Sequence, residues 1–299
     1  MDKHLAIVNA AAGSGQCGKL AGNAISDLRD KGLELDVWYT RRPGHAVELA
    51  RDALGQGYRS FIAVGGDGTA HEIVNGVAEV FSSPDERVCL GFLPLGTGNS
   101  FIRDYTRLGE AGAMAGLLRG RTRPCDVVRV RHAEGELYFI NIFSFGFVAD
   151  VCELTNARYK ALGSAGYAMG VMAMLARLRF EPVFMRLDGE KPWEQRAAFV
   201  SINNSQYTGG NMQMAPYANP ADGLVDLVVV GELGRAKFVS LFLKIFRGGH
   251  VHHPEVITSR AATVEFNFDA PLPVMVDGEV VHIAPRELDV LPGALDVRI

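Results

Sequence analysis

The 299-residue sequence predicts a two-domain protein. We expect an α/β domain with a parallel sheet in residues 1–124 and a β-rich domain, a β-sandwich or open barrel, in residues 125–299. Three observations support this division. The length exceeds what one hydrophobic core usually serves. Strand-like and helix-like segments alternate through the first part of the chain, which favours a parallel sheet with helices on both faces. After Pro124, short β-rich segments follow one another closely.

In the first domain, apolar or alternating runs predict four strands, and three segments with helical periodicity lie between them. The strands are expected at Leu5–Asn9, Leu33–Thr40, Phe61–Val64 and Cys89–Leu95. One helix is expected to carry Leu20, Ile25 and Leu28 on one face, and the others are expected at Ala46–Leu54 and Ile73–Phe81. The run Arg119–Pro124 predicts a linker to the second domain.

The second domain is expected to be mostly β-structure with two helical excursions, near residues 158–178 and 235–247. Asp-Gly pairs at 188–189, 222–223 and 277–278 predict tight turns between strands. The strands are expected at Val127–Arg131, Leu137–Ile142, Phe184–Leu187, Ala197–Asn203, Leu224–Val230, Thr263–Phe268, Pro273–Val276 and Leu288–Leu291.

Composition narrows the class of protein. The net charge is −4 and no lysine or arginine run is present, which argues against a nucleic-acid partner because such binding depends on basic patches. The four cysteines are widely spaced, with no Cys-x-x-Cys pair, so neither a zinc site nor a disulfide framework is expected, and a reducing cytoplasmic compartment fits best. No signal peptide is expected, and the uncharged stretch 161–176 falls short of the roughly 20 residues of a spanning helix.

The strongest chemical signal is the turn Gly65-Gly66-Asp67-Gly68-Thr69, between an expected strand and an expected helix. Its glycines let the backbone approach a ligand, and the first amides of the helix suit phosphate oxygens. Asp67 offers a carboxylate for magnesium, and Thr69 offers a hydroxyl. The alternative is an ordinary strand-to-helix turn with Asp67 or Thr69 as the helix cap. The turn is not a Walker P-loop, because no Gly-Lys-Ser/Thr follows.

Two further small-residue turns, Asn9–Gly15 and Pro94–Ser100, follow the first and fourth expected strands. The carboxyl ends of parallel strands share one edge of a sheet, so the three turns should converge and form a nucleotide site. In the second domain, Asp277-Gly278-Glu279 and Asn219–Leu224 are, taken alone, typical of turns.

In order along nearly the whole chain, these strings resemble the diacylglycerol kinase catalytic family, and specifically its bacterial lipid kinases, which are related to sphingosine and ceramide kinases. The matching strings are Asn9 with Ser14-Gly15, Thr40 with Gly44-His45-Ala46, Gly65–Thr69 with Glu72 and Asn75-Gly76, Pro94–Asn99, Asn141 with Gly146, Asn203 with Gly209-Gly210, Pro216, Asp222-Gly223 and Asp277-Gly278-Glu279. The fold implied is a phosphofructokinase- or NAD-kinase-like α/β domain followed by a β-sandwich domain.

The resemblance also implies roles for individual residues. The positions matched to ATP binding are Asn9, Thr40, Gly65, Gly66, Asp67, Gly68, Thr69, Glu72, Gly96, Thr97 and Asn99. Asp67 is similar to the carboxylate near the Mg²⁺ of the nucleotide, and Glu279 to the general base. Asn219, Asp222 and the Leu224 carbonyl are similar to a structural site for Mg²⁺, with Ca²⁺ as the alternative ion. Two departures from the family pattern are Ser100 in place of an aspartate, whose role Asp104 could take, and Asn219 in place of a frequent lysine.

The implied substrate is a membrane lipid, whose identity the sequence leaves open. The low-charge stretch Leu162–Leu178, with Met169, Met172 and Met174, could form a pliable apolar pocket or plain core. Phe238, Leu241, Phe242 and Ile245 share a helical face flanked by Lys237, Lys244 and Arg247, which would suit transient contact with the inner membrane surface or packing in the core. The competing functions are an NAD kinase, a sugar kinase of the phosphofructokinase type and a non-catalytic lipid-binding or regulatory protein. A homodimer is left open.

Overall fold

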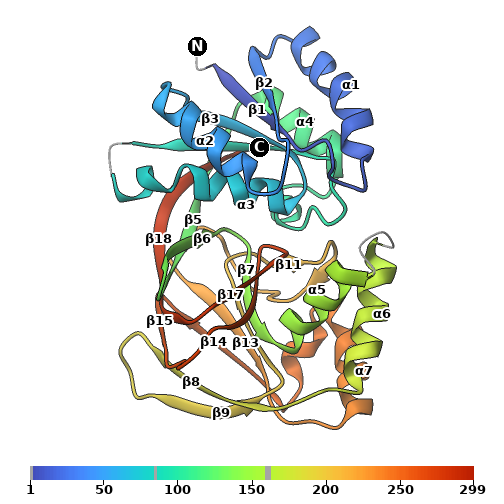
Figure 1. The fold of residues 1–299 in the computed structure, drawn as a ribbon, viewed down its shortest axis with the longest axis vertical. Helices are drawn as coiled ribbons and strands as arrows, with labels where there is room; N and C mark the ends of the chain where they lie inside the picture. The colour runs from blue at the N-terminus through green and yellow to red at the C-terminus, as the bar shows by residue number, and fades with distance from the viewer. Residues whose placement is uncertain (1–2, 84–85, 159–162) are drawn as a thin grey trace. The chain divides into compact units, whose positions relative to one another are not determined.

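The computed structural model describes residues 3–83, 86–158 and 163–299 and divides into two compact units (Figure 1). Unit 1 comprises Met1–Val127 and Leu291–Ile299, and unit 2 comprises Val128–Val290. The last nine residues therefore group with unit 1, whereas the sequence analysis assigned all of 125–299 to the second domain. The predicted fold class, an α/β part followed by a β-sandwich-like part, is confirmed.

Unit 1 is built on a parallel sheet in the order β2-β1-β3-β4-β18. Every residue of β1 and β3 is buried, as expected for strands covered on both faces. Helices α1 and α4 pack on one face through a core that includes Ala6, Val8, Ile62 and Val64. The strands are β1 (His4–Val8), β2 (Leu35–Tyr39), β3 (Ser60–Gly65), β4 (Val88–Pro94) and the end of β18 (Pro285–Arg298). The helices are α1 (Gln16–Asp30), α2 (His45–Gly55), α3 (Asp67–Gly76) and α4 (Gly109–Arg119).

Two predicted helices differ from those observed. The helix expected at Ile73–Phe81 begins earlier, because α3 starts at Asp67 inside the glycine turn and ends at Gly76, and a separate 3₁₀ helix covers Ala78–Ser82. In α1 the predicted inward position of Leu20 is wrong, since Leu20 is 45% exposed. The buried stripe of α1 consists of Cys17, Ala21, Ala24, Ile25 and Leu28.

Unit 2 contains two antiparallel sheets with a hydrophobic core between them. One has the order β14-β13-β10-β7-β16-β17, and the other is formed by β5, β6, β15, β8, β9 and the start of β18. Phe143, Val200 and Val274 of the first sheet meet Val130, Val183 and Val264 of the second in this core. The strands are β5 (Thr122–His132), β6 (Gly135–Phe139), β7 (Ile142–Gly146), β8 (Glu181–Leu187), β9 (Trp193–Ala197), β10 (Phe199–Asn203), β13 (Val225–Val230), β14 (Val256–Ala261), β15 (Thr263–Phe266), β16 (Leu272–Val276) and β17 (Glu279–Ile283), with a separate small pair β11 (Tyr207–Thr208) and β12 (Met212–Gln213).

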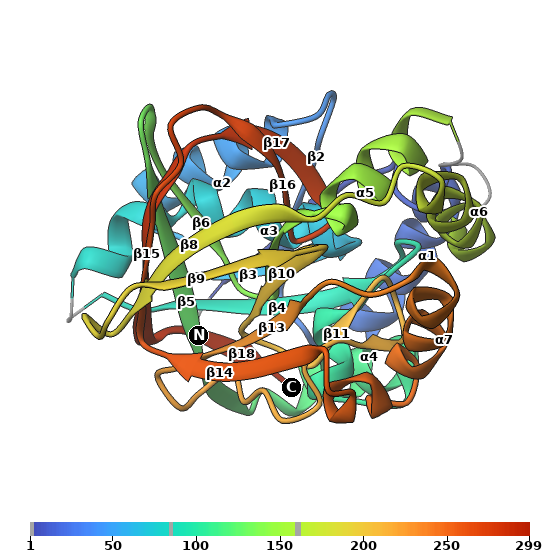
Figure 2. The same cartoon turned by 90° about the horizontal axis from the view of Figure 1, so that it is seen from below.

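Three helices gather at one side of unit 2, as Figures 1 and 2 show. They are α5 (Phe147–Arg158), α6 (Gly163–Leu175) and α7 (Arg235–Ile245). Their apolar residues form a second core with Phe199 and Val230 of the six-stranded sheet. The helix α5 was not expected from the sequence. Residues 159–162, part of the helix expected near 158–178, lie outside the described residues.

Two strands pass from one unit to the other. Thr122–Pro124, expected to be part of a linker, forms the start of β5, which continues to His132 in unit 2. The last strand, β18, pairs with β15 in unit 2 through residues 287–289 and with β4 in unit 1 through residues 295–297. Among the helices within 3–83, 86–158 and 163–299, none is both long and apolar enough to cross a membrane.

Candidate active site

The carboxyl ends of four parallel strands of unit 1 bring together residues predicted to bind a nucleotide. The Thr40 amide donates to the Val8 carbonyl at 2.9 Å, and the Asn9 amide donates to the Val64 carbonyl at 2.9 Å. The Gly96 amide donates to the Gly65 carbonyl at 2.8 Å. These bonds extend the pairing just beyond the ends of the strands, so Asn9, Thr40 and the two glycine turns line one edge of the sheet.

The glycine turns approach one another so closely that side chains are excluded. A Cβ atom on Gly96 would overlap the backbone of Gly66, and a Cβ on Gly65 would overlap the Thr69 hydroxyl. Gly13 has φ +60°, and a Cβ there would lie 2.9 Å from the Leu95 carbonyl oxygen. The prediction that the three turns lie together is therefore confirmed. Their use as a nucleotide site stays a prediction.

Two buried oxygen atoms in these turns have no hydrogen-bond partner. One is the Thr69 hydroxyl, in a residue that is 2% exposed. The other is Asn99 Oδ1, since the Asn99 amide nitrogen donates to the Pro94 and Gly96 carbonyls at 3.0 and 2.8 Å. Buried polar atoms almost always have a partner. Both atoms therefore fit a site whose ligand would supply the missing hydrogen bonds.

Asp67 stands at the start of α3 and holds the backbone of the neighbouring turn. Its Oδ2 accepts the Ser100 amide at 2.9 Å, and its Oδ1 accepts the Phe101 amide at 3.2 Å. The carboxylate therefore caps the 3₁₀ helix Phe101–Asp104. Ser100 is 1% exposed and contributes this backbone amide.

Glu72, predicted to contact the nucleotide, fastens α3 to the start of α2. Its two carboxylate oxygens accept the Gly44 and Ala46 amides, both at 2.9 Å. An acidic group is favourable at a helix N-terminus, where the amides carry partial positive charge. Of the other predicted residues, Thr97 is exposed and Gly68 is half-buried in the first turn of α3.

In unit 2, Asp277 and Gly278 form the two-residue turn between β16 and β17. Both have positive φ, 49° and 95°, as a tight hairpin turn requires. The Asp277 carboxylate is 3% exposed and accepts three backbone amides, those of Ile140, Asn141 and Ile142, at 3.0–3.2 Å. The tight turn predicted at Asp277-Gly278 is therefore confirmed, whereas the three amides that the Asp277 carboxylate binds were not predicted from the sequence.

Glu279 is the first residue of β17, directly after this anchored turn, and is exposed. It pairs across the hairpin with Val276. The Cys152 thiol of α5 donates to the Gly278 carbonyl at 3.5 Å, so α5 also packs on the turn. The turn therefore holds Glu279 at a fixed place on the surface of unit 2.

Among the residues predicted to form a structural metal site, the Asp222 carboxylate is paired with an arginine and not left open for a metal ion. Asp222 Oδ1 accepts the Leu224 amide at 3.2 Å, and Asp222 Oδ2 is bound to the Arg260 guanidinium. Arg260 Nε also lies 3.5 Å from Asp226, whose pKa is raised by burial. Asn219 is exposed. Within the described part of the chain, no three His, Cys, Asp or Glu side chains cluster as metal ligands would.

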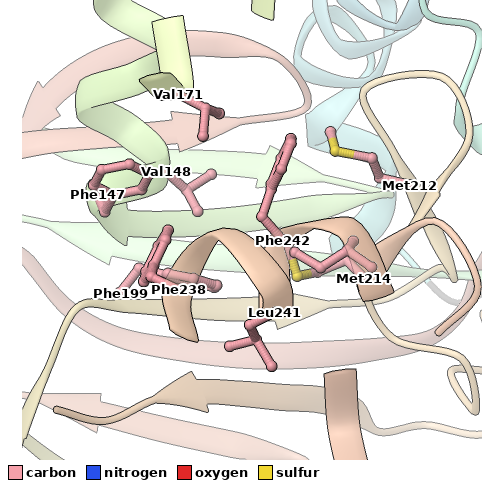
Figure 3. Close-up of a pocket in the computed structure, with 10 residues that line it drawn as sticks. Phe147, Val148, Val171, Phe199, Met212, Met214, Phe238, Leu241 and Phe242 are labelled. Atoms are coloured by element: carbon pink, nitrogen blue, oxygen red, sulfur yellow. The ribbon is translucent and has the colours of Figure 1, made fainter. Parts of the chain in front are cut away.

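An apolar pocket lies between the helices and the six-stranded sheet of unit 2 (Figure 3). Its cavity volume is about 20 Å³, room for roughly one water molecule. The methionines that line it are Met212 and Met214, whereas the predicted Met169 and Met172 are 47% and 61% exposed. The lining comprises Phe147 and Val148 from α5, Val171 from α6, Phe199 from β10, Phe238, Leu241, Phe242 and Ile245 from α7, and the two methionines.

Comparison with known proteins identifies the family. The diacylglycerol kinase catalytic domain matches residues 3–130, and the YegS C-terminal NAD kinase beta sandwich-like domain matches residues 141–299. A diacylglycerol kinase of Mycobacterium tuberculosis is 30% identical over 99% of this chain and 94% of its own length. The chain belongs to the diacylglycerol kinase family of lipid kinases. A diacylglycerol kinase of Bacillus subtilis is 30% identical over 94% of this chain and 91% of its own length.

A solved structure extends the family relation to the fold. The crystal structure of a diacylglycerol kinase from Bacillus anthracis has a TM-score of 0.73 at 22% identity, covering 99% of this chain and 96% of that chain. This member of the diacylglycerol kinase family therefore shares the fold across both units.

Proposed function

We propose that this chain transfers the γ-phosphoryl group of ATP, in the presence of Mg²⁺, to a hydroxyl group of a membrane lipid such as diacylglycerol. The apolar pocket of unit 2 is the observation that carries the choice of a lipid, because none of its ten lining side chains bears a charged or hydrogen-bonding group. The names of the relatives in Mycobacterium tuberculosis and Bacillus subtilis support diacylglycerol as the first substrate to test.

The turns of unit 1 supply groups suited to ATP. The start of α3 offers amides and partial positive charge for phosphate oxygens. The unpartnered Thr69 hydroxyl and Asn99 Oδ1 offer further contacts. Asp67 fits a magnesium ion, since a carboxylate that accepts two amides keeps lone pairs for another ligand. The bound ion would neutralise charge on the phosphate oxygens.

Glu279 would accept the proton of the lipid hydroxyl. An alcohol is a weak nucleophile at neutral pH, and a carboxylate within hydrogen-bond reach of it makes transfer faster. The exposed position of Glu279 leaves it open to a substrate, and the three amides bound to Asp277 keep the turn before it rigid. We assign Asp277 as the residue that positions this base.

The pocket must widen to admit an acyl chain. A volume of about 20 Å³ is far smaller than a chain of many methylene groups. Met212 and Met214 are the unbranched side chains of the lining and change rotamer easily, and Phe242 is the phenylalanine of the lining that is only half-buried. Figure 3 shows Phe242 rising from α7 in the middle of the pocket, with Met212 and Met214 to its right. We therefore expect these side chains to move when a lipid enters.

Contact with a membrane surface would come from the outer sides of α6 and α7. The inward face of α7, predicted to be able to contact lipid, is instead core, since Phe238, Leu241 and Ile245 are buried. Leu243 is 63% exposed on the same helix, together with exposed Lys237, Lys244 and Arg247. Met172 of α6 adds a further exposed apolar group. This mixture of apolar and basic groups suits an anionic bilayer at the inner face of the membrane.

The Asn219–Leu224 segment fits a divalent ion only if Arg260 moves away. A metal site needs carboxylate oxygens, and the guanidinium already neutralises Asp222. We propose that Mg²⁺ or Ca²⁺ competes with Arg260 for this carboxylate. The bound ion would organise the turn before β13 and take no part in phosphoryl transfer.

The direct test is transfer of radiolabelled phosphate from ATP to a panel of lipids in mixed micelles. The panel contains diacylglycerol, monoacylglycerol, ceramide, a sphingoid base and phosphatidylglycerol, with NAD as a separate acceptor. We expect labelled product with at least one lipid and none with NAD. Labelling of NAD alone would make the chain an NAD kinase. Lipid binding without labelling would identify a non-catalytic lipid-binding protein.

A further inference from the structure

His250 is a fully buried histidine that the proposed reaction does not use. It lies in the 3₁₀ helix Gly249–His252, shortly after α7 ends at Ile245. Its Nε2 is 2.9 Å from the Met214 carbonyl oxygen. A carbonyl can only accept, so Nε2 carries the hydrogen, and the ring is the neutral tautomer with a lone pair on Nδ1. Nδ1 is buried without a partner.

Gly248, two residues before His250, packs against the segment Gln213–Pro216, which also contains the carbonyl that the His250 ring binds. Gly248 has φ +65°, and a Cβ there would lie 2.6 Å from Pro216 Cγ and 3.1 Å from Gln213 Oε1. Only glycine allows this approach without displacing the segment. Gly248 and His250 together therefore hold Gln213–Pro216 by one steric contact and one buried hydrogen bond.

Gln206 holds the same segment through separate bonds. The Gln206 side-chain oxygen accepts a hydrogen bond from the side-chain Nε2 of Gln213 at 3.2 Å. The Gln206 backbone carbonyl accepts one from the backbone amide of Ala215, also at 3.2 Å. The Met214 amide bonds the Met212 carbonyl at 3.1 Å. The segment is therefore a fixed, tightly bonded strip whose position depends on what holds its ends and its carbonyls.

Met214 of this strip and Met212, the residue directly before it, line the apolar pocket, whose remaining wall includes four residues of α7. Figure 3 shows Met212 and Met214 on the far side of Phe242 from Phe147 and Val148. The bond from His250 to Met214 therefore ties the end of α7 to the methionine side of the pocket. A buried hydrogen bond of this kind fixes geometry because breaking it leaves a polar group unpaired.

We propose that His250 is a positioning residue that sets the width of the apolar pocket and thereby the acyl-chain preference of the enzyme. The proposal rests on the proposed lipid substrate. Donation from His250 to the Met214 carbonyl keeps the strip close to α7. Loss of that donor releases the strip and lets the pocket accept chains that the parent enzyme discriminates against.

Two substitutions separate the hydrogen bond from general packing. In His250→Gln the amide nitrogen reaches the place of Nε2 and can still donate to Met214. In His250→Asn the shorter amide nitrogen takes the place of Nδ1 and cannot. The matched control is His252→Asn, since His252 is exposed two residues away. Each variant is assayed with diacylglycerols of increasing acyl length at saturating ATP.

We expect His250→Asn to change the KM for the lipid by about fivefold, which is the effect of one lost hydrogen bond. The KM of this variant should also depend less on acyl-chain length. The KM for ATP should stay at the parent value. His250→Gln should restore the parent chain-length profile, and His252→Asn should match the parent throughout. If His250→Asn lowered the melting temperature but kept the parent lipid profile, the residue would be only structural and the proposal would be wrong.

A binding measurement keeps this proposal apart from the proposed function. A pyrene-labelled fatty acyl probe reports entry into the pocket without any phosphoryl transfer. If the parent binds the probe and His250→Asn changes its affinity while no lipid is phosphorylated, the proposed reaction fails and the role of His250 stands. If His250→Asn does not fold, Gly248→Ala displaces the same strip, and an unchanged probe affinity in that variant contradicts the proposal.

Discussion

Several acidic residues that were predicted from chemistry also hold the backbone in place. Asp67 accepts two amides, Glu72 accepts two, and Asp277 accepts three. A carboxylate that bonds several amides is costly to remove, because each buried donor left unpaired destabilises the fold by about 1–3 kcal/mol. Glu279 is different, since it is exposed. The two candidate catalytic carboxylates should therefore respond differently to substitution.

We expect Glu279→Gln to lower kcat for the best lipid by about 100-fold or more with an unchanged melting temperature. Asp67→Asn should lower both kcat and the melting temperature, because it weakens the cap on Phe101–Asp104 as well as the proposed site for magnesium. Steady-state kinetics with calorimetry on the same samples checks both. Glu194→Gln, an exposed glutamate on β9, is the control. A folded Glu279→Gln enzyme with parent kcat would exclude Glu279 as the base.

His250 predicts how stability depends on pH. Burial, with a smaller contribution from the charge of His252, lowers the pKa of His250 to about 4, although the hydrogen bond to the Met214 carbonyl acts in the opposite direction. In the unfolded chain the pKa is about 6.5. Between these values the unfolded state binds more protons, so the free energy of unfolding falls as pH drops from about 6.5 towards 4.

The full loss below pH 4 amounts to about 3 kcal/mol, from the 1.36 kcal/mol that one pKa unit represents. Urea unfolding at pH 7, 5.5 and 4.5 measures this loss. His250→Gln carries no titrating group and should lose less stability over the same range. Equal slopes for the parent and His250→Gln would show that other groups cause the acid sensitivity.

Arg260 and Asp222 offer a test of the second metal site. If a divalent ion competes with the guanidinium, Arg260→Gln should raise the affinity of the protein for Ca²⁺ or Mg²⁺ and make its melting temperature depend on that ion, with no nucleotide present. Arg260→Gln/Asp222→Asn should show no such dependence. Asp222→Ala alone should lower the melting temperature. If the melting temperatures of the parent and of Arg260→Gln were both independent of divalent ions, Asp222 would be only a turn residue.

At the scale of elements, the strands and helices of unit 1 were largely predictable, whereas part of unit 2 was not. Strictly buried strands such as β1 and β3 give uniform apolar runs between glycine turns. The helix α5 was missed because it follows β7 directly through Gly146, which has φ +81°. Residues 142–149 therefore read as one apolar run, although the chain changes from strand to helix within it.

The site was predictable where it depends on local sequence and not where it depends on packing. The glycine turns can be predicted from their residue types alone. The capping roles of Asp67 and Glu72 depend on amides 33 and 28 residues away in the sequence, which no local pattern reveals. The same holds for the pocket, because its methionines come from the segment after β11. It also holds for Leu20, because its exposure depends on which side of α1 packs against the sheet.

The outer side of α7 carries the next prediction. Lys237→Gln/Lys244→Gln/Arg247→Gln removes three exposed cations on and next to α7 and leaves the buried face intact. We expect several-fold weaker co-sedimentation with anionic vesicles and unchanged melting, since the attraction of cations to anionic headgroups is lost. The control replaces Arg186, Lys191 and Arg196 of the β8–β9 region with glutamine. Equal vesicle binding by the α7 variant and the parent would leave α7 as a core helix only.

At the scale of the whole molecule, unit 1 is discontinuous in sequence. Leu295–Val297 pair with β4, the Arg298 side chain donates to the Leu117 carbonyl at 2.8 Å, and Gly116 packs against Ile299. Asp126 accepts the Gly293 amide at 2.7 Å. The C-terminal residues therefore complete the sheet that carries the candidate nucleotide site.

We expect deletion of residues 291–299 to disrupt unit 1, because it exposes the edge of β4 and the surface of α4 that Ile299 covers. Circular dichroism, thermal melting and ATP binding of the truncated chain measure the effect. Substitution of Arg298 by glutamine in the full chain serves as the mild control, since it removes one hydrogen bond and keeps the strand. A truncated protein that melts like the parent and binds ATP would show that β18 is dispensable for unit 1.

The return of β18 to unit 1 also bears on the order of events during synthesis. The ribosome releases β1 to β4 before unit 2, but the strand that covers β4 emerges only after unit 2. At roughly 5–20 residues per second, the intervening chain takes roughly 10–40 s to make. During that time β4 is an open strand edge that other nascent chains can pair with. Unit 2 can close first, and unit 1 is completed only when residues 291–299 have emerged, so a chain terminated before them would be a substrate for chaperones and proteases.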